Sequence, residues 1–115
     1  MTLKGAGVHI YDVVTRWPGV TAHPHRFGGT EYRLGKRELG HIHGDHLVDI
    51  PFPTRVRDEV VTAGLAEPHH LLQASGWVSL YLRESADLDR AIALFRRSFE
   101  LAQRKWSRRQ EQDEL

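Results

Sequence analysis

The chain has 115 residues, of which 40% are hydrophobic and 27% charged, a composition typical of a small globular protein. It contains no cysteine, which excludes disulfides, thiolate zinc sites and cysteine nucleophiles. A formal net charge of +1 argues against binding to polyanions through bulk charge. No apolar run approaches the roughly 20 residues of a membrane span, and the N-terminus lacks a signal peptide, so we expect a cytoplasmic protein without membrane contact.

Apolar residues spaced by three and four predict a first helix over residues 8–17, which Pro18 and Gly19 end. Residues 20–29 are punctuated by proline and glycine and predict an extended or looping connection. Alternating polarity then predicts a three-stranded antiparallel meander, with strands over residues 30–34, 37–43 and 46–50.

The second half of the chain predicts a helix, two strands and a long helix. The ranges are residues 54–63 for the helix, 67–72 and 77–82 for the strands, and 85–109 for the last helix. The order α-β-β-β-α-β-β-α predicts an α+β fold, with about five antiparallel strands and helices on one face of the sheet. We expect one domain over residues 1–115, with flexible ends at 1–7 and 110–115.

Turn length decides which side chains of the meander share a face. Two-residue turns would pair Tyr32 with Leu39, His41 with Val48, and His43 with His46. His41 and His43 would then lie on the apolar face, and Asp49 would point to the opposite face. This register predicts no His–Asp dyad within the hairpin, and Asp45 is interpreted as a turn residue.

Three histidines of the second hairpin are candidate metal ligands. His41, His43 and His46 would meet at one end of the sheet and hold a divalent ion, with water in an open position. The set lacks an acidic ligand. The alternative is that these imidazoles are hydrogen-bonded side chains where the core meets water.

A wider histidine-lined site for a small polar or anionic ligand is a second hypothesis. Its candidate residues are His25, Arg26, His41, His43, His46 and His69. For His25 and Arg26 the favoured alternative is a solvated loop. The sequence contains no nucleotide fingerprint, flavin motif or serine nucleophile elbow, so no such cofactor is predicted.

Nucleic-acid binding is a third hypothesis, carried by the basic last helix. Its cations are Arg96, Arg97, Arg104, Lys105, Arg108 and Arg109. Glu100 and the acidic residues Glu111, Asp113 and Glu114 offset them, so a solvated helix face is the favoured interpretation.

Several phrases of the sequence, in order, resemble the small bacterial and fungal "luciferase domain" proteins. They are residues 28–35, 38–44, 48–53, 67–70 and 75–79, within a resemblance that covers roughly residues 17–105. The resemblance implies membership of a family without an assigned activity. It implies neither a flavin barrel nor light emission, since a (β/α)₈ barrel typically takes about 250 residues.

A more distant resemblance is to the MmcQ/YjbR-like proteins. It rests on residues 17–20, 76–80 and 97–101 and implies a similar order of elements. DNA binding proposed for those proteins would transfer only as an analogy between folds. The working hypothesis is a small-ligand or accessory binding domain, with a metal-dependent or acid–base enzyme and a nucleic-acid binder as alternatives. The sequence does not indicate an oligomeric state.

Overall fold

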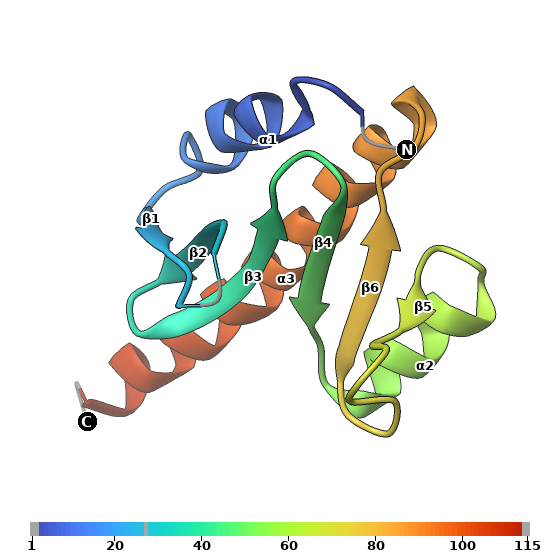
Figure 1. Cartoon of the computed structure of the whole chain (residues 1–115). Coiled ribbons are helices and arrows are strands. Elements are labelled where there is room, and N and C mark those ends of the chain that lie inside the picture. The colour runs from blue at the N-terminus through green and yellow to red at the C-terminus, as the bar shows by residue number, and fades with distance from the viewer. Residues whose placement is uncertain (1–2, 27, 114–115) are drawn as a thin grey trace.

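The structure, a computed structural model, describes residues 3–26 and 28–113 (Figure 1). Its elements are α1 (Ala6–Val14), β1 (Val20–Pro24), β2 (Thr30–Leu34), β3 (Arg37–His43), β4 (Leu47–Pro51), α2 (Thr54–Thr62), β5 (Glu67–Pro68), β6 (Trp77–Tyr81) and α3 (Ser85–Asp113). The predicted α+β class and the order of elements are confirmed, and the boundaries move by a few residues.

The described strands form one antiparallel sheet of six, in the order β1-β2-β3-β4-β6-β5. Residues 20–24, expected to be a connection, instead form the edge strand β1 and pair with β2. The strand expected over residues 67–72 is only the two-residue β5, after which the chain leaves the sheet as a loop. The loop that follows this short strand lies over the face of the sheet that carries Asp49 and His43.

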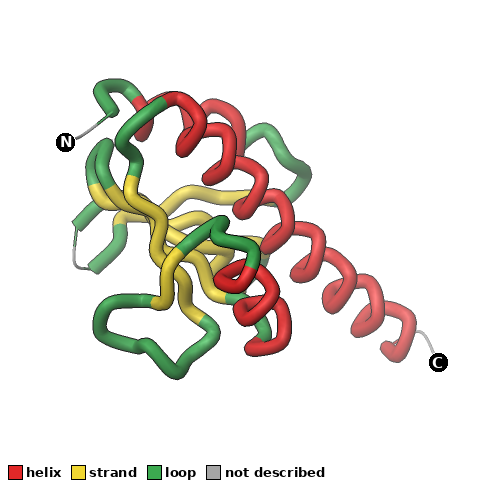
Figure 2. The backbone as a smooth tube through the Cα atoms, turned by 90° about the vertical axis from the view of Figure 1, so that its right-hand side faces the viewer, coloured by secondary structure: helices red, strands yellow, loops and turns green. Residues whose placement is uncertain are grey.

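The helices cover one face of the sheet and supply the core (Figures 1 and 2). α3 crosses behind the strands, and its apolar stripe includes Phe95 and Phe99, which are fully buried. Ile10 of α1 and Val60 of α2 are also fully buried within this cluster. The strands contribute Tyr32, Leu39, Ile42, Val48, Ile50, Val78 and Leu80 to the same core. The opposite face of the sheet is therefore left for polar side chains.

The predicted register of the meander is wrong in both hairpins. Arg33 pairs with Glu38 as expected, but a β-bulge then makes Gly40, not Leu39, the partner of Tyr32. The second turn has three residues, so His43 pairs with Leu47.

Each difference shifts the register by one residue and therefore moves side chains to the other face of the sheet. The bulge turns His41 and His43 away from the core, with Ile42 facing inward in their place. The longer turn makes Asp49 the cross-strand partner of His41, so the expectation that Asp49 points away from the histidines is also wrong.

The flexibility expected at residues 1–7 and 110–115 stays a prediction. α1 begins at Ala6 and α3 continues to Asp113, so residues 6–7 and 110–113 lie within helices. Residues 1–2 and 114–115 lie outside the described residues. Across the described ranges, no helix combines the length and the apolar character that crossing a bilayer requires.

Asp45, in the turn between β3 and β4, also anchors the start of α1. Its carboxylate accepts hydrogen bonds from the backbone N–H of Gly5 at 3.1 Å and of Gly7 at 2.8 Å. A remote side chain thus satisfies amides that the first turn of a helix leaves unpaired.

We expect α1 to loosen in acid because of this contact. The hydrogen bonds from Gly7 and Gly5 lower the pKa of Asp45 from its usual 3.8. A depressed folded-state pKa means that the contact contributes stability above the ordinary pKa and loses it as the pH falls below that value. Amide hydrogen-exchange protection factors of α1 should therefore drop at low pH, and Asp45→Ala should lower them already at neutral pH. Asp12→Ala, at an exposed site on α1, is the control, and equal loss in both variants would contradict this role.

Candidate functional site

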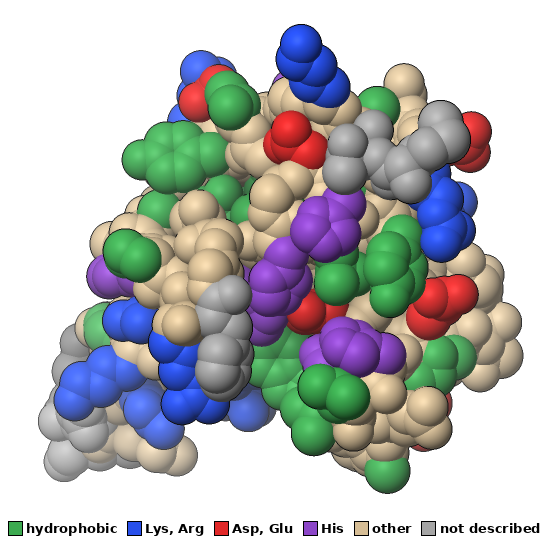
Figure 3. Space-filling model, viewed as in Figure 1, with side chains coloured by type: hydrophobic (Ala, Val, Ile, Leu, Met, Phe, Trp, Pro, Cys, Tyr) green, Lys and Arg blue, Asp and Glu red, His purple; other side chains and the backbone are tan. Residues whose placement is uncertain are grey.

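A pocket of about 760 Å³ lies on the face of the sheet opposite α3, and histidine side chains gather around it (Figure 3). The residues that line it are Pro24, His25, Arg26, Glu31, Arg33, Glu38, His41, His43, Asp49, His69, His70, Leu71, Leu72 and Trp77. Of the six side chains expected at a ligand site, five therefore share one pocket. His46 lies apart, exposed in the β3–β4 turn.

Asp49 is the centre of this pocket. Its carboxylate is almost fully buried, and Oδ2 lies 3.3 Å from Nε2 of His41 and 3.1 Å from Nε2 of His43. The other oxygen, Oδ1, accepts a hydrogen bond of 2.6 Å from the hydroxyl of Ser79 on β6. Burial would raise the pKa of Asp49, but the bonds from His41 and Ser79 outweigh burial and lower it to about 2. The carboxylate is therefore ionised at neutral pH.

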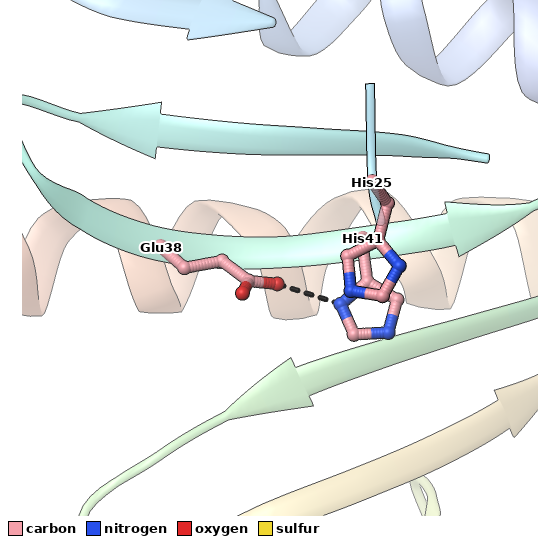
Figure 4. Close-up of side chains that lie close together, drawn as sticks. All are labelled: His25, Glu38 and His41. Atoms are coloured by element: carbon pink, nitrogen blue, oxygen red, sulfur yellow. Dashed lines mark hydrogen bonds and ion pairs between the residues drawn. The ribbon is translucent and has the colours of Figure 1, made fainter. Parts of the chain in front are cut away.

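His41 is held between two carboxylates. Its Nδ1 lies 2.6 Å from Oε2 of Glu38, the bond drawn in Figure 4, while its Nε2 faces Asp49. Burial alone would lower the pKa of His41, but the hydrogen bonds to Asp49 and Glu38 raise it to about 9. In the protein without metal, the imidazole is thus a cation that donates to both neighbours.

His25 packs directly on His41. Figure 4 shows the two rings stacked on each other. Their centroids are 3.9 Å apart and their planes are 22° from parallel. Burial and the neighbouring His41 lower the pKa of His25, so it is neutral beside the charged ring. His25 therefore forms a wall of the pocket and covers His41 from solvent, although a solvated loop was the favoured prediction.

His69 has its orientation fixed by the loop that carries it. Its Nδ1 accepts hydrogen bonds from the backbone N–H groups of Leu71 and Leu72, at 3.1 and 3.2 Å. A neutral imidazole that accepts at Nδ1 must carry its proton on Nε2. This Nε2–H lies 3.8 Å from Oδ2 of Asp49, so His69 presents a donor to the pocket. Arg57 of α2 holds the same loop through the carbonyl of Gln73.

In the described ranges, two groups of three side chains have atoms that could bind a metal ion, which are imidazole nitrogens and carboxylate oxygens, within 4.8 Å of one another. They are His41, His43 and Asp49, and His25, Glu38 and His41. The first group replaces the expected His46 with Asp49, which supplies the acidic ligand that the sequence hypothesis lacked. Because His41 already uses Nδ1 for Glu38, its Nε2 is the atom available to an ion beside Asp49.

Glu38, Trp77 and Ser79 were not predicted to belong to the site. All three lie on the same face of the sheet as Asp49, and Trp77 lies 5.3 Å from His41 between ring centroids. In the strand predicted over residues 77–82, alternation puts Trp77 and Ser79 on one face, and this was the available signal. Without the correct register, however, that face could not be matched to the histidines.

Comparison with protein-family models matches the Luciferase domain to residues 36–98, more than half of the chain. The match includes His41, His43, Asp49 and His69 and ends before the last turns of α3. No curated protein and no solved structure matches this chain. The distant likeness to MmcQ/YjbR-like proteins stays a prediction. The chain belongs to the luciferase-domain family.

Proposed function

We propose that the protein binds one divalent transition-metal ion through His41, His43 and Asp49, and that this ion binds a small polar or anionic molecule in the pocket. One observation carries the proposal: two imidazole Nε2 atoms lie 3.1 and 3.3 Å from the same oxygen of a buried carboxylate. With bonds of about 2.0–2.1 Å, two ligand atoms on a tetrahedral zinc ion are about 3.3 Å apart. The two separations between histidine and aspartate atoms therefore match those of ligands on one ion, and all three ligand atoms lie within 4.8 Å of one another.

The hydrogen bond from His41 to Glu38 supports this proposal. Metal-binding histidines usually donate their second ring N–H to a carboxylate, which fixes the tautomer and makes the ligand nitrogen more basic. Nδ1 of His41 has such a partner in Glu38 at 2.6 Å. An ion bound at Nε2 would take the place of the proton that this atom otherwise carries.

Three protein ligands leave a coordination position for water or a substrate, which distinguishes catalytic metal sites from structural ones. His69 has the wrong tautomer for a ligand through Nε2, because its Nδ1 accepts two backbone hydrogen bonds. Its Nε2–H can instead donate to a molecule bound at the open position. Arg26 on the rim, with Leu71 and Trp77 in the wall, suits a small molecule with an anionic end and an apolar body.

The competing explanation is a metal-free cluster, in which protonated His41 bridges Glu38 and Asp49. It satisfies the same polar atoms and would bind ligands by charge and hydrogen bonding alone. The two explanations differ in whether the purified protein takes up an ion stoichiometrically.

Metal content and affinity test the proposal. After chelation and dialysis, the protein should bind one equivalent of Zn²⁺, measured by elemental analysis and calorimetry, and Co²⁺ should give the visible absorption of a nitrogen–oxygen ligand set. His43→Ala should weaken zinc binding by about tenfold or more, since it removes one ligand. His46→Ala removes a nearby exposed imidazole and should bind as the unmodified protein does. Absence of stoichiometric binding, or equal losses in the two variants, would leave the metal-free cluster as the explanation.

A further inference from the structure

A second pocket, here called the basic groove, lies at the far end of α3. It has a volume of about 760 Å³ and lies between the β2–β3 turn and the last turns of the helix. The turn contributes Lys36 and Arg37, and the helix contributes Lys105, Trp106 and Arg109. Figures 1 and 2 show that α3 runs on past the sheet at this end, so the groove is open to solvent along the projecting helix.

Some basic residues of α3 outside the groove have carboxylate partners. Arg96 pairs with Glu100, and Arg97 pairs with Glu59 of α2. Among the side chains that the structure describes, which exclude those of residues 111 and 113, none forms an ion pair with the groove cations Lys36, Arg37, Lys105 and Arg109. The groove is therefore a local concentration of positive charge, formed by four cations without a described ion pair, on a chain whose formal net charge is only +1.

Trp106 gives the groove a flat apolar surface. Its side chain is 51% exposed, although the apolar stripe to which it belongs is buried farther up the helix. One edge of the indole packs on the backbone of the β2–β3 turn, where a side-chain carbon added at Gly35 would lie 2.9 Å from the ring. The ring is thus held in place from one side while the remainder stays accessible.

We propose that the basic groove binds single-stranded nucleic acid, with phosphates on the four cations and an unpaired base stacked on Trp106. Cations with an exposed aromatic ring are the combination that such strands require, because every base has a face that can stack. A base pair within a duplex is already stacked and cannot use the ring in this way. A second copy of this chain is a poorer occupant, since symmetric pairing would bring eight cations together.

Fluorescence anisotropy of a labelled oligothymidylate, about 12 nucleotides long, tests the proposal with the full-length protein. Trp106→Ala should weaken binding by about fivefold or more through the loss of stacking. The double variant Lys105→Glu/Arg109→Glu should weaken it further and reduce the dependence of affinity on salt. The control, Lys4→Glu/Arg83→Glu, makes the same change in net charge at exposed residues elsewhere and should bind like the unmodified protein. Circular dichroism of each variant verifies that it is folded.

Three results would overturn the proposal. The first is an absence of oligothymidylate binding at low salt. The second is equal weakening in the groove and control double variants. The third is that polyphosphate, duplex DNA or anionic vesicles bind with the same affinity as the oligothymidylate, and that Trp106→Ala does not change this affinity. Because the groove and the histidine pocket share no residue, removal of metal should leave the strand affinity unchanged.

Discussion

Asp49→Asn is expected to weaken zinc binding by about a hundredfold or more, because it removes the anionic ligand of the proposed site. Asparagine has nearly the same shape as aspartate and can still accept the hydrogen bond that the Ser79 hydroxyl donates to Oδ1. The position that faces His41 and His43 then holds an amide NH2, which carries no negative charge and accepts no hydrogen bond. Zinc affinity measured by competition with a chelator of known strength gives the result directly.

The same substitution should also destabilise the metal-free protein. Asp49 is almost fully buried, and it is one of the two carboxylates that compensate the imidazolium of His41. Removing one partner of a buried charged pair costs about 3–5 kcal/mol, and because Glu38 still pairs with His41 we expect a loss of about 2–4 kcal/mol in the free energy of unfolding. Denaturant unfolding in the presence of chelator measures this loss separately from metal binding.

Ser79→Ala is the matched control for Asp49. It removes the bond to the other carboxylate oxygen and leaves the charge in place, so zinc affinity should fall by roughly tenfold, as expected for a group that only orients a ligand. If Asp49→Asn binds zinc as tightly as Ser79→Ala, the carboxylate is not a ligand, and the proposed metal site is wrong.

Much of the fold followed from local pattern. The predicted boundaries match the structure for the strands at residues 30–34 and 37–43 and for the start of the last helix. These boundaries were predictable because alternation and helical spacing are properties of short segments. β1 was missed because it has only five residues, ends in proline and is followed by a stretch with two glycines, Gly28 and Gly29, which favoured a connection. β1 is stabilised by pairing with β2, and a pattern within one short segment does not reveal such a pairing.

The site was harder to predict because it depends on two features that each shift the strand register by one residue, a turn and a bulge. Gly44 and Asp45 match the signal for a two-residue turn, yet the turn also includes His46, which moves Asp49 beside His41. Glycine at position 40 is compatible with a regular strand as well as with a bulge, and only the bulge turns His41 and His43 to the open face. The histidines were thus identified by type and spacing, while their carboxylate partner was assigned to the wrong face.

Gly40→Ala is expected to destabilise the sheet strongly. The backbone at Gly40 has φ +146°, a conformation that residues with a side chain rarely adopt, which costs about 1–3 kcal/mol. An added carbon would also lie 2.7 Å from the ring of Phe95 and 2.9 Å from the carbonyl oxygen of Asp49. Crowding of a packed core adds about 1–3 kcal/mol, so the total loss should be about 4 kcal/mol in the free energy of unfolding.

Gly64→Ala separates the two causes. Gly64 also has a positive φ, +73°, but an added carbon there would have no described atom within 4 Å, so only backbone strain of about 1–2 kcal/mol is expected. Denaturant unfolding of both variants gives the difference that crowding contributes. Gly40→Ala should in addition weaken zinc binding, because the bulge positions His41 on the open face, whereas Gly64→Ala should not. Equal stability losses with unchanged zinc affinity in both variants would mean that the bulge can relax without moving His41, and that the face on which the histidines lie is set by the turn at residues 44–46 instead.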